Sequence, residues 1–150
     1  MKNLFEASTA HDIKARVSRL RPDSERQWGK MTPPQMLAHC STAFEMAMGE
    51  IKPPRAFIGR VLGGIVKPLA LKDETPLRRN APTTRELIVA DRRDLEMERA
   101  RLSAMVDRFT AGGSAVCTDH PHAFFGRLKP EEWAVLMYKH LDHHLRQFGV

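Results

Sequence analysis

The chain has 150 residues, of which 42% are apolar and 28% are charged, so it can bury one core and is neither disordered nor collagen-like. Its formal net charge of +6 permits anionic ligands or nucleic acid but is too moderate to identify either. The chain has no signal-peptide pattern, no apolar run near the ~18 residues that span a bilayer, and only two cysteines, Cys40 and Cys117. We therefore expect a cytoplasmic protein with a single domain over residues 1–150 and no membrane partner.

Two helices are predicted in the first third of the chain. The first runs from about Thr9 to Leu20 on the spacing of its apolar residues, and it ends before Pro22. The second has the clearest start signal, with Thr32 as a capping residue, proline next, and Gln35 three residues after the cap. Its apolar stripe continues to Gly49.

The region from Ile51 to Pro82 is rich in proline and basic residues. Apolar residues at helical spacing between Phe57 and Val66 predict a short amphipathic helix, which Pro68 should end. Seven basic and two acidic residues lie in this region. Long connections between helices are often functional, so the region is a candidate to hold an anionic substrate, with a mobile, solvated surface as the simpler interpretation.

A third long helix is predicted from the capping box Thr83–Glu86 to about Thr110, ending at Gly112-Gly113. Its apolar residues recur every seven positions; they are Ile88, Leu95, Leu102 and Phe109. Asp91 and Glu98 occupy neighbouring inward positions, where apolar residues would be expected.

A fourth helix should begin at Pro130-Glu131-Glu132, with the carboxylates near the positive end of the helix dipole. Its inner face contains two histidines among large apolar residues: Trp133, Leu136, Met137, His140, Leu141, His144 and Phe148. No segment has a convincing strand pattern. The sequence predicts an all-α fold, a four-helix bundle with one long crossover between the second and third helices.

Three histidines are candidates for a metal site. His140 and His144 are four residues apart, which places both imidazoles on one helix face. His39 interrupts the apolar stripe of the second helix. Alone, His39 would be read as a hydrogen-bonded core residue, but bundle packing brings the two faces together. Three imidazoles would bind a divalent transition metal and leave a coordination position open, as catalytic sites do.

Other residues are candidates for supporting roles. His143 competes with His144 as the third ligand, or supports the ligands without binding the ion, because it is also near the face of His140. Glu98 and Asp91 are candidates to accept a hydrogen bond from a metal-bound imidazole; the alternative for both is an ion pair with an arginine. His120 and His122, in the loop before the fourth helix, are candidates for the mouth of the site or are solvated surface groups.

Two stretches, Trp28–Cys40 and Phe124–Phe148, resemble the DinB/YfiT-like metal-binding four-helix bundles, and within them a bacterial branch described as a domain of unknown function. The middle of the chain is similar in layout. The resemblance implies a metal, zinc or nickel, held by His39, His140 and His144. It also implies homodimers and, for some relatives, transferase or isomerase chemistry with a low-molecular-weight thiol.

Three functions follow as hypotheses. The first is a metal-dependent enzyme, a thiol S-transferase or a hydrolase, in which the ion activates a thiol or water toward a small substrate. The second is a bundle that binds a metal or small ligand without turnover. The third is a basic helical protein that contacts nucleic acid. The sequence lacks a phosphate-binding glycine loop and an aromatic RNA platform, so we expect a small-molecule partner rather than nucleic acid.

Overall fold

The computed structural model describes all 150 residues, Met1–Val150, and is entirely helical, which confirms the predicted all-α class. Five α-helices follow one another in the chain: α1 Ala7–Ser18, α2 Pro33–Ala47, α3 Phe57–Leu71, α4 Leu95–Gly112 and α5 Pro130–Gln147. Two 3₁₀ turns, η1 (Arg85–Leu87) and η2 (Gly113–Val116), flank α4. No helix is long and apolar enough to cross a bilayer.

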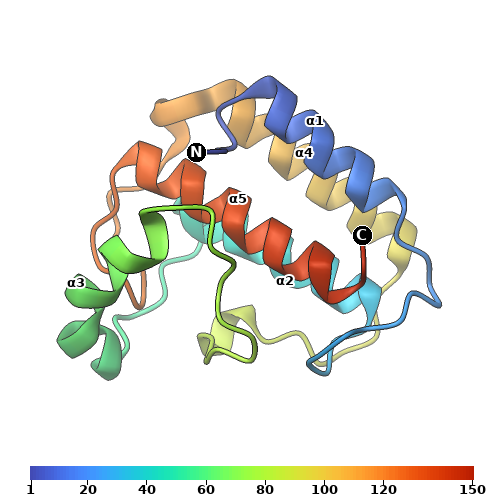
Figure 1. The fold of residues 1–150 in the computed structure, drawn as a ribbon, viewed down its shortest axis with the longest axis horizontal. Helices are drawn as coiled ribbons and strands as arrows, with labels where there is room; N and C mark the ends of the chain where they lie inside the picture. Colours follow the sequence, from blue (N-terminus) through green and yellow to red (C-terminus); the bar gives the residue numbers. More distant parts are fainter.

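Helices α1, α2, α4 and α5 pack against one another around a common core, whereas α3 lies at one end and contacts only α5 among the helices (Figure 1). The core contains 27 buried apolar residues. Its largest fully buried side chains include Trp133 from α5, Phe44 from α2 and Phe109 from α4. Helices α2 and α5 contact each other directly, which is the arrangement that the predicted metal site requires.

The capping box predicted for α2 is present. The Thr32 hydroxyl accepts a hydrogen bond from the backbone of Gln35, and the Gln35 side chain accepts one from the backbone of Thr32. These two bonds satisfy backbone donors that the helix itself leaves unpaired. They fix the start of α2 and thus the rotation at which His39 enters the core.

The predicted start of the third helix is wrong. Instead of continuing from Thr83, the chain forms the short turn η1 and a loop, and α4 begins only after Asp94, whose carboxylate accepts a hydrogen bond from the backbone of Met97. Side chains of α2 bind the intervening backbone: His39 contacts the Leu87 carbonyl, and the Gln35 amide donates to the Asp91 carbonyl. These tertiary bonds stabilise the non-helical backbone between η1 and α4.

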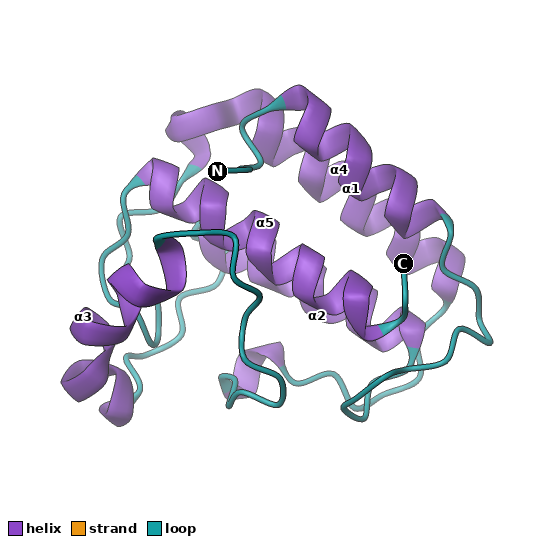
Figure 2. Cartoon of the chain, viewed as in Figure 1, coloured by secondary structure: helices purple, strands orange, loops and turns teal.

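The predicted end of the helix in the crossover is also wrong, because α3 continues through Pro68 to Leu71. An internal proline removes one backbone hydrogen bond and normally disfavours a helix. Here the final turn is held from outside, since Lys139 of α5 donates to the carbonyls of Ala70 and Asp73 and Leu71 is buried. The crossover between α2 and α4 therefore contains two helical elements, α3 and η1 (Figure 2).

Candidate metal centre

The structure brings His39, His140 and His144 together. Each offers one ring nitrogen, and the three nitrogens lie within 4.8 Å of one another. The ring centroids are 4.9 Å apart for His39 and His140, 4.6 Å for His39 and His144, and 4.7 Å for His140 and His144. His39 and His144 are buried, and His140 is half-buried as a residue, with its ring nitrogen Nδ1 buried.

Hydrogen bonds on the far side of two rings fix their tautomers. His39 Nδ1 lies 2.7 Å from the Leu87 carbonyl, which can only accept, so Nδ1 carries the proton and Nε2 presents a lone pair. His144 Nδ1 lies 2.9 Å from Gln147 Oε1, and the orientation of that amide is set because its Nε2 donates to the Trp28 carbonyl at 2.7 Å. His144 therefore also presents its Nε2 lone pair.

His140 is not satisfied by the protein alone. Its Nε2 is 3.0 Å from His39 Nε2, which requires a proton between them because His39 has only a lone pair there. That proton would leave the buried Nδ1 of His140 as an acceptor, yet Nδ1 has no hydrogen-bond partner. A cation on the Nε2 side would take the place of the shared proton, and the ring proton of His140 would then lie on Nδ1, which still has no partner in the protein.

All three imidazoles are held neutral. Burial lowers the pKa of His39, partly offset by the hydrogen bond to Leu87. Burial, with the nearby His39, lowers the pKa of His144 to about 3. The pKa of His140 falls well below its usual value through burial and then through the charges of the other histidines. Neutral imidazole is the form that binds a metal, so the site needs no deprotonation at neutral pH.

Comparison with known proteins agrees with a single family over nearly the whole chain. The sequence matches the family described as "Protein of unknown function (DUF1569)" over residues 4–149. The chain belongs to the DUF1569 family. No curated protein and no solved structure matches it.

In this DUF1569 member, His143 is close to the cluster but is not one of the three converging residues. Its ring lies against that of Trp28, with centroids 5.3 Å apart, and the Arg79 guanidinium lies 4.1 Å from the Trp28 ring centroid. His143 also lies 5.0 Å from His144, centroid to centroid. The geometry thus favours His144 over His143 as the third ligand, with His143 packed behind it.

The two loop histidines have different surroundings. His120 Nε2 lies 3.1 Å from the Pro53 carbonyl. His122 Nδ1 accepts hydrogen bonds from the backbone of Phe124 and Phe125, and its ring lies 5.6 Å from that of Trp133. Burial, then the charge of Arg55, lowers the pKa of His122 to about 4. Both histidines hold the loop in place through these bonds.

The expectation that Glu98 and Asp91 support the imidazoles is not met. Glu98 is buried but pairs with Arg93 at 3.1 Å and Arg101 at 3.4 Å, and Asp91 is exposed and pairs with Arg93 at 3.0 Å. Neither carboxylate bonds an imidazole. Both carboxylates pair with arginines of α4 or of the loop before it, and a charged guanidinium binds a carboxylate more strongly than a neutral imidazole does.

The groups that do support the imidazoles, the Leu87 carbonyl and the Gln147 amide, were missed by sequence reasoning. A backbone carbonyl leaves no signal in a sequence. Gln147 could have been found from the sequence, because it follows His144 by three residues and so lies on the same helix face. Gly29 lies beside that amide with φ +77°, and a Cβ there would lie 2.4 Å from the Gln147 amide nitrogen, so a side chain at this position would displace the amide.

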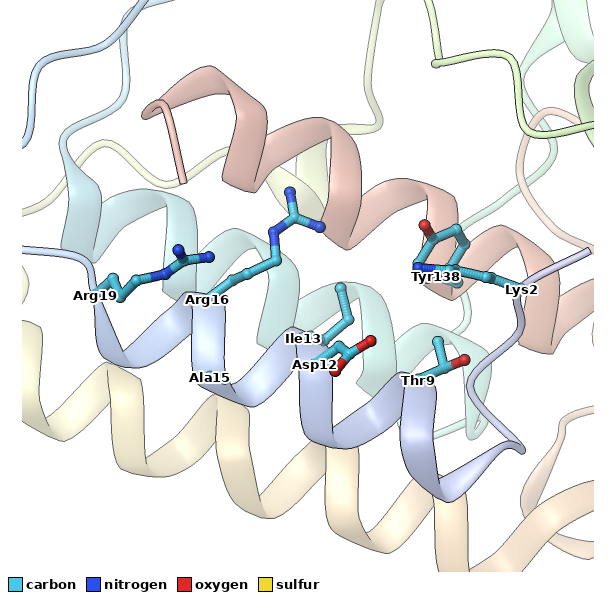
Figure 3. Close-up of a pocket in the computed structure, with 8 residues that line it drawn as sticks. All are labelled: Lys2, Thr9, Asp12, Ile13, Ala15, Arg16, Arg19 and Tyr138. Atoms are coloured by element: carbon cyan, nitrogen blue, oxygen red, sulfur yellow. The ribbon is translucent and has the colours of Figure 1, made fainter.

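A groove in the surface lies elsewhere. It lies between α1 and α5, has a volume of about 440 Å³ and is lined by Lys2, Thr9, Asp12, Ile13, Ala15, Arg16, Arg19 and Tyr138 (Figure 3). None of the three histidines lines it. Arg16 in this groove is already paired with Asp142 at 2.7 Å and with the carbonyl of Val150. The groove is therefore separate from the candidate metal centre.

Proposed function

We propose that this protein is a metal-dependent enzyme in which His39, His140 and His144 bind one divalent transition metal, zinc or nickel. The observation that carries the proposal is the convergence of three neutral ring nitrogens within 4.8 Å, from two helices. Three nitrogen ligands leave part of a tetrahedral shell free, which is the pattern of catalytic rather than structural zinc sites.

The reaction class follows from that ligand set. When bound by His39, His140 and His144, such an ion would act as a Lewis acid and would lower the pKa of a bound low-molecular-weight thiol or water. The protein residues orient this chemistry. Leu87 and Gln147 hold the rings of His39 and His144, and burial keeps competing protons off all three rings.

We also propose that α1, α2, α4 and α5 form a DinB-like four-helix bundle, with α3 and η1 in its crossover. Support comes from the packing of these four helices on one another and from the positions of the histidines, one on α2 and two on α5. Some relatives in that superfamily use cellular thiols, which makes thiol transfer the first reaction to test.

The metal assignment is tested by elemental analysis of protein purified without an affinity tag. The wild-type protein should contain about one divalent ion per chain, and His140→Ala should lose it. His11→Ala is the matched control, because it removes an exposed histidine of α1 that does not belong to the cluster. Equal metal content in wild type and His140→Ala would refute the site.

A second candidate is a metal-binding protein without turnover. One observation favours it. His39 and His144 are hydrogen-bonded to a carbonyl and an amide, and no carboxylate that could act as a general acid or base is bonded to these imidazoles. The metal-loaded protein should be incubated with a panel of electrophiles, with and without cellular thiols. Turnover that disappears in His140→Ala but not in His11→Ala supports the enzyme; no turnover across the panel favours the binding protein.

A further inference from the structure

Helix α3 exposes the side that a helix normally buries. Its large apolar side chains face solvent, with exposed fractions from 40% to 84%; they are Phe57, Ile58, Val61, Leu62, Ile65 and Leu69. At about 100° per residue these positions fall on one continuous arc of the helix. An apolar arc of this size on a surface helix marks an interaction site.

The opposite side of α3 is fixed to the rest of the molecule. Gly59 and Gly63 are buried against the loop that precedes α5, and a Cβ at Gly63 would lie 2.1 Å from the Phe124 carbonyl oxygen. Lys67 forms an ion pair with Glu132 at 3.0 Å. The close contact and the ion pair hold the helix in one orientation, so its apolar side chains cannot simply rotate inward.

The surroundings of the apolar arc are positively charged. Between Ile51 and Glu74 the chain has two acidic residues, Asp73 and Glu74, and five basic ones; the basic residues are Lys52, Arg55, Arg60, Lys67 and Lys72. Lys67 is paired with Glu132, and Lys72 lies 3.9 Å from Asp73. Lys52, Arg60 and Lys72 are exposed. In Figure 1, α3 lies at the edge of the molecule, where a flat surface can reach it. An exposed apolar helix flanked by lysine and arginine is typical of helices that lie in the interface of an anionic membrane.

A second copy of the chain fits this surface less well. A helix of 15 residues is about 22 Å long and about 10 Å wide, so its outer face covers far less than the ~800 Å² per partner of a stable dimer. Pairing two such helices would also bring two positively charged segments together. Nucleic acid would meet the charges but would leave the apolar side chains in water.

We propose that α3 docks the protein on a bilayer surface that contains anionic phospholipid, with its apolar arc among the acyl chains and its basic residues at the headgroups. This reverses the expectation from the sequence that no membrane is a partner. The proposal does not depend on the metal centre, and the two fail separately.

The test is sedimentation of the full-length protein with vesicles of phosphatidylcholine alone or mixed with phosphatidylglycerol. Wild type should bind the anionic vesicles, and Ile65→Asp should reduce the partition coefficient at least about tenfold. Ile88→Asp is the matched control, because Ile88 has a similar exposure, 62% against 66%, but lies outside α3. Both variants change exposed positions and should keep the wild-type melting temperature.

Binding should weaken as salt is added, because part of it is electrostatic. Three results would overturn the proposal. They are absence of binding to anionic vesicles, an equal loss of binding in Ile65→Asp and Ile88→Asp, or a wild-type dimer in solution that only Ile65→Asp converts to monomer. The last result would assign the apolar arc to a second copy.

Discussion

Single residues decide how the three imidazoles are presented. Gln147 has two fixed partners, donating to the Trp28 carbonyl and accepting from His144 Nδ1. A hydrogen bond to the outer nitrogen of a ligating histidine sets its tautomer and raises its basicity. Gln147 therefore acts through His144 as a positioning residue for the proposed metal.

Replacing Gln147 by leucine removes both hydrogen bonds while keeping a side chain of similar size. We expect Gln147→Leu to weaken metal affinity by about 10–100-fold, measured by competition with a chromophoric chelator. The exposed Gln27 gives the control, since Gln27→Leu makes the same change in the adjacent loop. Unchanged affinity in Gln147→Leu would show that the amide does not position His144.

The lowered pKa of His122, in the loop before α5, should make the free energy of unfolding depend on pH. Its pKa is lowered from 6.5 to about 4, so below pH 6.5 the unfolded chain binds a proton at this residue that the folded chain does not. Above pH 6.5 neither state binds this proton and no stability is lost. As the pH falls from 6.5 to 4, protonation of the unfolded chain lowers the free energy of unfolding progressively. The loss is about 3 kcal/mol at most.

In His122→Asn an amide oxygen can accept the backbone hydrogen bonds of Phe124 and Phe125 but cannot titrate. The free energy of unfolding of this variant, measured by urea denaturation with chelator present, should depend less on pH between 6.5 and 4 than that of wild type. Parallel curves for the two proteins would contradict the assignment.

At the level of helices, the sequence predicts an element well where its signals are local. The start of α2 follows from Thr32 and Gln35, whose side chains bond within four residues of each other. Helical spacing predicts that His140 and His144 share one helix face, and the expected packing of two helices in a bundle adds His39, which is 101 positions away from His140. The structure brings the three side chains together, and their role as metal ligands stays a prediction.

Prediction failed where distant residues compete for the backbone. The capping box at Thr83 is a sound local signal, yet the chain is not helical between Ile88 and Asp94, where α2 side chains bind the Leu87 and Asp91 carbonyls and stabilise the extended backbone. Pro68 fails as a stop signal because Lys139, far along the chain, binds the end of α3. Such contacts exist only after folding, so no pattern within one segment reveals them.

The corrected start of α4 gives a paired prediction. Asp94→Ala removes the capping carboxylate and should lower the free energy of unfolding by about 1 kcal/mol, within a range of roughly 0.5–2. Thr83→Ala should leave it unchanged within about 0.5 kcal/mol, because Thr83 is exposed and caps nothing. Thermal or urea denaturation measures both. A larger loss of stability in Thr83→Ala than in Asp94→Ala would instead support a helix that begins at Thr83.

For the whole molecule, the proposed ion would tie together segments that are remote in sequence. His39 on α2 and His140 on α5 are 101 positions apart, and the two helices contact each other through the core. A ligand that binds only the folded state stabilises it by an amount that grows with the logarithm of the ratio of free ligand to its dissociation constant, once that ratio is well above one. Metal binding should therefore raise the stability of the entire core, and a single domain should respond with one cooperative transition.

Removing the metal should consequently lower the melting temperature. With free Zn²⁺ at about 100 times its dissociation constant the stabilisation is ~2.7 kcal/mol, which is about 5–10 °C for a chain of this length. Scanning calorimetry with Zn²⁺ or with chelator measures this difference. In His144→Ala, which leaves only two ligands, the two conditions should give nearly the same temperature, whereas His11→Ala should behave as wild type. If Zn²⁺ stabilises wild type and His144→Ala equally, the ion binds elsewhere and α2 is not joined to α5 through it.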